Sequence, residues 1–353
     1  MDYEIIDLQS KKRWRELLSE LPSSQRDIYF LPEYYELCHN SGKEFIRCFV
    51  FRHKERLALY PFIATPVSGL GLLDSECEYC DIQGAYGYNG VISSSCDATF
   101  IDAFYEAFSQ HCIESGVVAE FARFHPFLNN HEFSSNHMDV LLNRQTVWLD
   151  LTQGHDAIWE KSYASRNRNM IRKALKNNLS AEFSTGLDSY KRFYDLYKET
   201  MKRLQADGFY FFDWSYFQQM FERLGKMQFI VEVLHDGSPI ASILVLHCGE
   251  YAHYHLSARD DNFHNLGAGN LALDAAIKRL AEAGCKKFNL GGGFCQDDSL
   301  FKFKSSFSKE RMNFYIGKKI HNQDIYQKLC KAWEEKNPEK KETYSKFILK
   351  YRK

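Results

Sequence analysis

The sequence lacks a hydrophobic stretch long enough to cross a bilayer. Its first residues, MDYEIIDLQSKKRW, also lack the basic segment and apolar run of a secretory signal. These absences predict a cytoplasmic protein with at most peripheral membrane contact. An excess of charge of one sign is missing too, since the net charge of the 353 residues is −1. We therefore expect no DNA partner, and any anion must bind at a local basic cluster.

The ten cysteines do not form the spacing of a metal site. Several lie within apolar segments, as Cys48, Cys112 and Cys248 do, which is typical of reduced thiols in a reducing compartment. Cys77 and Cys80 form a CxxC pair, and no second pair of ligands accompanies it. A Ser-His-Asp or Cys-His arrangement is not evident either. We expect no metal site and no nucleophilic side chain.

The predicted elements occur twice in the same order. Residues 45–64 predict two strands joined by a turn, and residues 98–124 predict a helix followed by a strand. Residues 228–258 predict a three-stranded meander with turns at HDGS and CGE, and residues 268–290 again predict a helix and a strand. The repeat favours a duplicated α/β (α+β) fold. A boundary near WLDLTQGHD divides the chain into residues 1–150 and 151–353.

A helical stretch separates the two copies. Aromatic and apolar residues recur at helical spacing from Tyr190 to Leu204, which is typical of a buried stripe. A second helix is expected between Asp213, as its N-cap, and Gly225, as its stop.

Two glycines one residue apart, Gly267 and Gly269 of HNLGAGN, precede an amphipathic helix. Backbone N–H groups at a helix start point outward, and glycine lets an anion approach them closely. The same pattern fits a tight loop that only packs the helix against its neighbours. The glycines alone leave both interpretations open.

Residues 161–176, KSYASRNRNMIRKALK, carry six basic residues and no acidic one. On a helix, Arg168, Arg172 and Lys176 form one stripe, and the apolar residues, Leu175 among them, are expected to face inward. A charged run is often only a solvated face. Six like charges without a carboxylate nevertheless favour a phosphate or polyanion partner, so Arg168 and Arg172 are candidate substrate-binding residues.

A glycine- and tyrosine-rich loop occupies residues 78–91. Tyr86 and Tyr88 alternate there with the small residues Ala85 and Gly87. Flat amphipathic rings around a turn are typical of a surface that binds a sugar or a nucleotide. We therefore include the two tyrosines among the candidate substrate-binding residues.

A second glycine-rich loop, residues 291–293, follows a predicted strand and precedes Lys302, Phe303 and Lys304. The carboxyl end of a strand is the usual ligand side of an open α/β sheet. Lys304 is a candidate for holding a phosphate or a developing oxyanion, and Lys302 for contacting the substrate. The alternative is a surface lysine beside a structural phenylalanine.

Together these segments resemble known families. The meander, the HNLGAGN helix start and the following strand look like the second half of the GNAT acyltransferase core, whose Q/R-x-x-G-x-G/A signature binds coenzyme A pyrophosphate. His264 stands where that signature has Gln or Arg. The segments RNRNMIRKALKNN, YAHYHLSA, FNLGGG and LFKFKSSF, in this order, resemble the Fem family of peptidoglycan-bridge aminoacyltransferases. That family has two GNAT-like domains and moves an amino acid from aminoacyl-tRNA to an amine of a cell-wall precursor.

The resemblance implies two tandem GNAT-like domains, each with a mixed, mostly antiparallel sheet flanked by helices. Residues 1–150 would form the acceptor side, and residues 151–353, with the C-terminal helices, would hold the donor. By position in the family motifs, Tyr254, Phe303, Lys304 and Arg203 would be catalytic, and His264, Gly267, Gly269 and Asn270 would bind the donor.

We therefore expect an N-acyltransferase that acts on a cell-envelope precursor, such as a peptidoglycan precursor, a lipid-linked precursor or a nucleotide-linked amino sugar. No tightly bound cofactor is expected, because acyl-CoA or aminoacyl-tRNA would be a co-substrate. The glycine signature favours coenzyme A, and the Fem resemblance favours tRNA, although the long charged heptads of the family's helical arm are missing. A non-catalytic tandem-GNAT protein that binds a nucleotide or RNA is the alternative.

Direct transfer to the amine is expected, with Tyr254 or a nearby water relaying a proton. Tyr254 and Lys304 should then lie side by side in one cleft. On a regular strand, Tyr254 shares a face with Ala252 and Leu256, whereas His253 and His255 point the other way.

Overall fold

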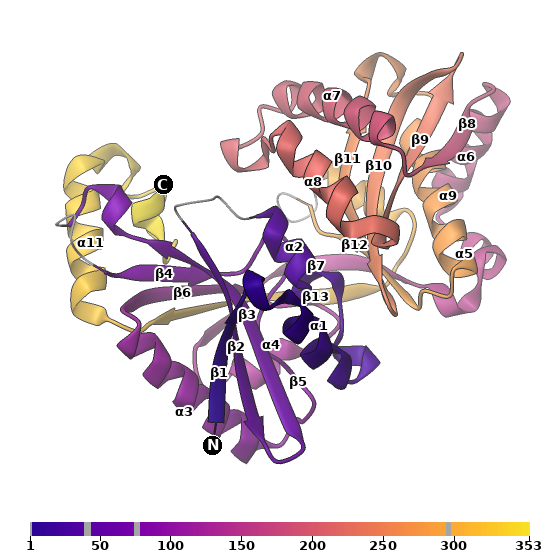
Figure 1. Ribbon diagram of the computed structural model, residues 1–353. Helices are drawn as coiled ribbons and strands as arrows, with labels where there is room; N and C mark the ends of the chain where they lie inside the picture. Colours follow the sequence, from indigo (N-terminus) through magenta and orange to yellow (C-terminus); the bar gives the residue numbers. More distant parts are fainter. Residues whose placement is uncertain (1, 39–43, 74–77, 294–297) are drawn as a thin grey trace. The chain divides into compact units, whose positions relative to one another are not determined.

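The computed structural model describes residues 2–38, 44–73, 78–293 and 298–353 (Figure 1). The chain forms two compact units. Unit 1 comprises Met1–Asn143 and Phe314–Lys353, and unit 2 comprises Arg144–Asn313. The chain passes between the units twice, each time within a strand, β7 (Asp139–Asp150) and β13 (Arg311–Ile320).

Residues 314–353 belong to unit 1, so the prediction that they extend the second domain is wrong. β13 pairs antiparallel with β6 (Val117–Arg123), and Ile320 lies opposite Ala119. α11 (Gln323–Lys336) covers the same strand, because Leu329 and Trp333 share a hydrophobic cluster with Val118. An amphipathic pattern predicts a helix but does not say which sheet the helix covers.

The sheet of unit 1 has the strand order β1-β2-β3-β4-β6-β13, and β5 also pairs with β3. β4 and β6 run parallel, and the other neighbours run antiparallel. One face packs against α3, where the Phe108 ring lies 5.1 Å from that of Phe49 and 5.0 Å from that of Tyr60. The expected hairpin and helix–strand unit are confirmed. The further elements are β1 (Asp2–Asp7), α1 (Lys11–Glu20), α2 (Pro32–Leu37), β2 (Phe45–His53), β3 (Arg56–Pro66), β4 (Cys80–Gln83), β5 (Ile92–Ser93), α3 (Ala98–Glu114) and α4 (Asn130–Ser134).

The sheet of unit 2 has the order β7-β12-β11-β10-β9-β8, in which β11 and β12 run parallel and the other neighbours antiparallel. The predicted meander is confirmed as β9, β10 and β11, and the predicted helix and strand after it as α9 and β12. The elements are α5 (His155–Lys161), α6 (Ser165–Lys176), β8 (Ser180–Ser184), α7 (Leu187–Arg203), α8 (Trp214–Leu224), β9 (Gln228–His235), β10 (Ser238–Cys248), β11 (Tyr251–Arg259), α9 (Ala268–Glu282), β12 (Lys287–Gly291) and α10 (Ser299–Ser305).

Helices cover both faces of this second sheet (Figure 1). Val231 and Val233 pack with α9 in one hydrophobic cluster. Glu232 between them points to the other face, where it accepts hydrogen bonds of 2.8 and 2.6 Å from Arg192 of α7. The stripe predicted on α7 is buried from Tyr190 to Tyr197, but Leu204, just past the helix end, is 61% exposed.

No helix in the described part of the chain is long and apolar enough to cross a membrane. Cys80 begins β4, whereas Cys77, the other cysteine of the CxxC pair, lies outside the described residues.

A buried carboxylate fixes residues 351–352 to the sheet of unit 1. Asp81 is 1% exposed and accepts hydrogen bonds from the Tyr351 hydroxyl at 2.7 Å and from the Arg352 guanidinium at 2.6 Å. Arg352 also donates to the carbonyl of Thr65 at 2.7 Å. The segment after α11 is thus held by a charged pair that is mostly shielded from water.

We expect Asp81→Ala to lower the free energy of unfolding by about 3 kcal/mol, because it leaves the Arg352 guanidinium without its carboxylate in a mostly buried position. Urea unfolding monitored by circular dichroism measures the change. Asp139→Ala, at an exposed position, is the control and should change stability by less than about 0.5 kcal/mol. Equal urea unfolding midpoints for the two variants would contradict a stabilising role of the Asp81–Arg352 pair.

Candidate active site

The start of α9 presents backbone N–H groups without a side-chain cap. Gly267 is the N-cap with φ +81°, no side chain accepts from the first turn, and that turn contains no acidic residue. Gly267 is required by packing as well, since a Cβ there would lie 2.4 Å from the carbonyl oxygen of Met170. A Cβ at Gly269 would meet only the Phe303 ring, at 3.9 Å. The packing interpretation therefore applies to Gly267, while Gly269 has space beside it.

Two asparagines join α6 to the first turn of α9. The Asn270 amide donates to the side-chain oxygen of Asn167 at 2.7 Å. Asn167 is 1% exposed, and its own amide nitrogen has no hydrogen-bond partner within the described residues. The sequence gives no signal for Asn167, because it is an uncharged residue within a run of basic ones.

Two predicted site residues meet where β11 and β12 separate. Residues 251–253 of β11 pair with β12, and β11 then continues to Arg259 against β10. Tyr254 is the first residue past the shared pairing, and β12 ends at Gly291. The Lys304 amine lies 5.3 Å from the centre of the Tyr254 ring. The structure thus brings together the two residues that the sequence predicted to lie side by side.

Lys304 is buried although it carries an amine. Its side chain is 6% exposed, and Nζ donates a hydrogen bond of 2.7 Å to the carbonyl of Gly292. Burial lowers the pKa of Lys304 to about 7; the Asp298 carboxylate opposes this shift, and the Arg144 guanidinium adds to it. Burial raises the pKa of Tyr254 to about 12, so its phenol stays protonated near neutral pH and can donate a hydrogen bond.

Phe303 and Lys302, which precede Lys304 on α10, lie in the same part of unit 2. Phe303 packs against the main core of unit 2 and lies next to Gly269 at the start of α9. Lys302 is exposed on the same helix. Phe303 thus connects Gly269 to α10, and the next residue of that helix, Lys304, lies beside Tyr254.

A β-bulge changes the faces of β11. Leu256 pairs with Leu244, but Tyr254 pairs with Val245, so His255 is the extra residue. Adjacent residues of β10 point to opposite faces, and the same must hold for their partners Leu256 and Tyr254. The prediction that Tyr254 and Leu256 share a face is wrong because the bulge interrupts the alternation. His255 is buried and lies 3.0 Å from the Tyr216 hydroxyl, and burial lowers its pKa to about 3.

Arg203 and His264 both contact Asp261, which precedes Gly267 and Gly269 in the chain. Arg203, the last residue of α7, forms an ion pair with Asp261, to which Arg259 also binds at 3.0 Å. The His264 ring lies 2.7 Å from the Asp261 carbonyl oxygen and can donate to it. In this structure Arg203 thus fixes the segment that precedes α9 through its ion pair with Asp261. Its predicted catalytic role and the donor-binding role of His264 remain predictions.

The basic helix α6 packs against α9. Ile171 and Ala174 face the core as predicted, but Leu175 is 55% exposed, because it lies past the edge of the buried stripe. Arg168 donates to the carbonyls of Trp159, Glu160 and Tyr163 at 2.6–3.3 Å. Its charge therefore holds the preceding turn together, which weakens the case for substrate binding. Arg172 is exposed and lies over the Trp159 ring at 5.7 Å.

Residues 165–305 match the family model described as acetyltransferase (GNAT) domain. The crystal structure of FemX superposes with a TM-score of 0.69 at 15% identity, covering 93% of this chain and 99% of FemX. The chain has a Fem-like tandem GNAT fold. No curated protein sequence is significantly similar to that of this tandem GNAT chain.

Two further solved structures share this tandem GNAT fold. One is the C-terminal domain of a protein assigned as lysylphosphatidylglycerol synthetase from Agrobacterium fabrum, with a TM-score of 0.55, 13% identity, and coverage of 90% of this chain and 93% of that chain. The other is a tandem GNAT protein from the clavulanic acid biosynthesis pathway, with a TM-score of 0.52, 12% identity, and coverage of 90% and 98%.

The tyrosine loop lies in the first GNAT unit, after β4. Arg123 donates hydrogen bonds of 2.7–3.2 Å to the backbone carbonyls of Gly84, Ala85 and Gly87. These hydrogen bonds fix the backbone of the loop. The Tyr88 ring contacts the rings of Tyr29 and His125 edge-on, at 5.1 and 5.3 Å. Tyr86 and Tyr88 are both partly exposed, so a substrate contact by either stays a prediction.

In unit 1, the chain pairs again with the segment after β6 beyond the end of β4. After β4, Asn89 forms a parallel bridge with Phe124, and it exchanges hydrogen bonds of 2.7 Å with the Arg123 backbone. Asp97 caps α3 by accepting from the Phe100 N–H at 3.0 Å. A carboxylate thus stands at the helix start that corresponds to the uncapped start of α9.

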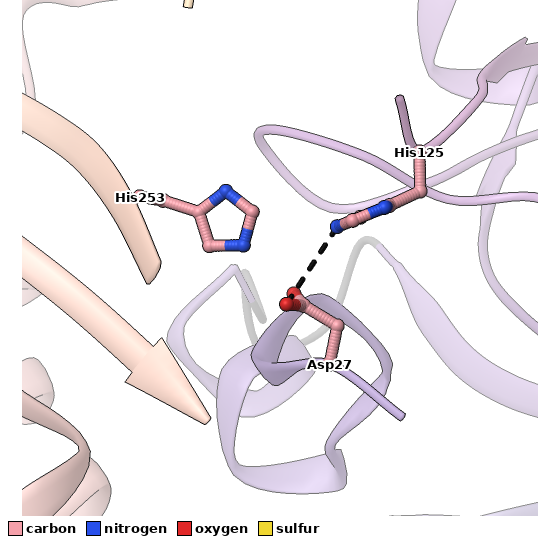
Figure 2. Close-up of side chains that lie close together, drawn as sticks. All are labelled: Asp27, His125 and His253. Carbon is pink, nitrogen blue, oxygen red and sulfur yellow. Dashed lines mark ion pairs between the residues drawn. The ribbon is translucent and has the colours of Figure 1, made fainter. Parts of the chain in front are cut away.

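A buried histidine and a buried carboxylate lie close together near that loop (Figure 2). His125 Nε2 is 3.6 Å from an Asp27 carboxylate oxygen, and both side chains are fully buried. The Phe127 N–H donates to His125 Nδ1 at 3.2 Å. Nδ1 is therefore an acceptor, and the ring proton lies on Nε2, toward Asp27. His253, also drawn, belongs to the second unit.

Proposed function

We propose that this protein is an N-acyltransferase that moves an acyl or aminoacyl group from an activated donor to an amine of a cell-envelope precursor. One observation carries the proposal. In unit 2, β11 and β12 separate at a buried amine and a phenol, Lys304 and Tyr254, and the adjacent Phe303 lies against a helix start without a side-chain cap. The match of residues 165–305 to the GNAT family supports the same reaction class.

The chemistry needs an amine and an activated carbonyl held close together. Thioesters and aminoacyl esters are already reactive, so positioning and stabilisation of the oxyanion contribute most of the rate. The protonated Tyr254 hydroxyl is suited to donate a hydrogen bond to the oxyanion or to the leaving group. We propose direct transfer, with no acyl group carried by the enzyme.

The donor phosphates would bind at the start of α9. The backbone N–H groups of its first turn and the dipole of this 15-residue helix favour an anion. Gly269 gives the anion access, and Asn270 and Asn167 lie beside it. Either coenzyme A or the 3′ end of an aminoacyl-tRNA offers the phosphate that this position requires.

The two units would have different roles. Donor binding belongs to unit 2, because in unit 1 Asn89 closes the corresponding strand separation and Asp97 places a negative charge at the helix start. Unit 1 would then contribute to the acceptor side, with Tyr86 and Tyr88 as candidate contacts. The likeness to FemX and to the lysylphosphatidylglycerol synthetase domain supports an acceptor of the cell envelope, whether nucleotide-linked or lipid-linked.

The donor site is tested with Gly269→Asp, and Gly269→Asn is a control of nearly equal volume. Coenzyme A and bulk aminoacyl-tRNA are titrated by calorimetry. We expect the aspartate to weaken binding of the true donor by about tenfold or more, because it opposes the donor phosphates at close range. The asparagine should weaken binding much less. Equal loss in both variants, in folded protein, would contradict a phosphate at this position.

Salt dependence separates the two donors. RNA bound along α6 should lose affinity steeply with salt, and Arg172→Glu should reduce that slope. Coenzyme A, with few phosphates, should show a shallow slope that Arg172→Glu leaves unchanged. If neither ligand binds and neither supports transfer to amino sugars or lysine peptides, the proposed function is wrong.

A further inference from the structure

Lys304 lies where the attacking amine must lose a proton. We infer that the Lys304 side-chain nitrogen is the general base that accepts this proton, and that Arg144 is the positioning residue that keeps it able to do so. The inference rests on the proposed acyl transfer and adds to it the residue that activates the acceptor.

The surroundings of Lys304 differ from those of a lysine that acts through its charge. Nζ is buried and donates to one backbone carbonyl, that of Gly292. Within the described residues, Lys304 forms no ion pair with a carboxylate. A Cβ at Gly291 would lie 3.3 Å from Nζ, so glycine at that position leaves space beside the nitrogen. A desolvated amine with space beside it favours the neutral form, whose lone pair can accept a proton.

Arg144 provides a second positive charge next to Lys304. Its guanidinium donates to the Gly293 carbonyl at 2.7 Å, one residue beyond the carbonyl that Lys304 binds. A Cβ at Gly292 would lie 3.1 Å from Arg144 Cδ, so the arginine stem crosses the glycine run closely. Two cations on successive carbonyls repel each other. Lys304 is the one that can lose its proton, so this repulsion lowers the pKa of its amine.

The charged and titratable groups around Lys304 come from three elements. Asp298 at the start of α10 favours the protonated amine, and Arg144 of β7 opposes it. Tyr254 of β11 is neutral near pH 7, because burial raises its pKa to about 12. Burial lowers the pKa of Lys304 itself to about 7, so a large fraction of the amine is neutral at physiological pH.

The acceptor ammonium gives one proton to the neutral Lys304 nitrogen, and the free amine forms a C–N bond with the donor carbonyl carbon. The tetrahedral intermediate expels the thiolate of coenzyme A or the ribose alkoxide of tRNA when the C–S or C–O bond breaks. The second nitrogen proton leaves with that group, and Lys304 later releases its proton to water.

A base and a cation respond to pH in opposite ways. If Lys304 accepts a proton, kcat/KM rises as the pH passes through the pKa of its amine. If Lys304 acts instead as a cation on an oxyanion or a phosphate, kcat/KM falls over the same range. A permanently charged replacement distinguishes the roles as well, since arginine could replace a cation but could not replace a base.

The test is the pH dependence of kcat/KM for wild type, Arg144→Gln and Lys304→Arg, with whichever donor, acetyl-CoA or bulk aminoacyl-tRNA, supports wild-type turnover. We expect the acidic limb of Arg144→Gln to move to higher pH by about one unit, because a like charge is removed. Arg13→Gln, on unit 1, is the control and should leave the limb in place. Lys304→Arg should lose activity at every pH by about a hundredfold or more.

The outcomes separate this inference from the proposed function. Turnover by wild type with an unshifted limb in Arg144→Gln, or with activity retained in Lys304→Arg, overturns the assignment of the base and leaves acyl transfer intact. Absence of turnover with both donors overturns the proposed function itself. The Arg144→Gln arm still decides if Lys304→Arg fails to fold.

Discussion

Lys304→Met should lower kcat by about a hundredfold or more without unfolding the protein. Methionine keeps most of the stem and removes the nitrogen that the reaction uses, and loss of a general base typically costs that factor or more. The substitution also removes a desolvated amine from a buried position, so thermal stability should be unchanged or higher. Steady-state kinetics and a melting curve on the same preparation measure both effects.

Two further variants complete this series. Lys309→Met, at an exposed lysine between α10 and β13, should have wild-type kinetics. Tyr254→Phe keeps the ring beside Lys304 and removes the hydroxyl, so kcat should fall by about a hundredfold, as expected for one hydrogen bond to the transition state. Wild-type kinetics in both Lys304→Met and Tyr254→Phe would move the reaction to another part of the chain.

Gly267→Ala should unfold or severely destabilise unit 2, with a loss of about 3 kcal/mol or more. The new Cβ would lie 2.4 Å from the Met170 carbonyl oxygen, and φ of +81° is unfavourable for alanine. Neither helix can shift easily, because Asn167 and Asn270 join them at the same place. Urea unfolding and thermal melting measure the effect.

Gly269→Ala is the matched control, since it adds the same methyl group two residues later. Its Cβ would have an ordinary contact with the Phe303 ring at 3.9 Å, and φ there is not positive. Stability should stay within about 1 kcal/mol of wild type or rise slightly, because alanine favours a helix more than glycine does. If the two variants are equally stable, the two glycines do not have the separate roles described above.

The elements of unit 2 could be predicted from the sequence because local signals agree there. Residues 228–258 contain apolar runs separated by turns that carry glycine, so each strand was correctly identified. The place of residues 314–353 could not be predicted, since the partner of β13 depends on pairing across the whole chain. The prediction that Leu256 shares a face with Tyr254 was wrong for a similar reason, because no local signal marks the bulge at His255.

The site was predicted in part. Tyr254 and Lys304 were chosen by resemblance, and their proximity follows from the parallel pairing of β11 and β12. Arg144 was missed because it lies in a strand far from every motif. Arg168 looked like a free cation, but a guanidinium can turn back onto nearby carbonyls, and charge patterning does not show this.

Unit 2 is an insertion within unit 1, and this order of segments affects how the chain can fold during synthesis. Residues 144–313 are contiguous, and their two ends lie together, because Thr146 donates to the Met312 carbonyl at 3.3 Å. This segment leaves the ribosome before residues 316–320 of β13 and Arg352, which are the partners of β6 and Asp81. Unit 2 can therefore complete its core while unit 1 is still incomplete. At that stage the β6 edge and the Asp81 carboxylate have no partners. A chaperone that binds the nascent chain would find its target in residues 1–143, which are translated before unit 2 and complete their fold after it.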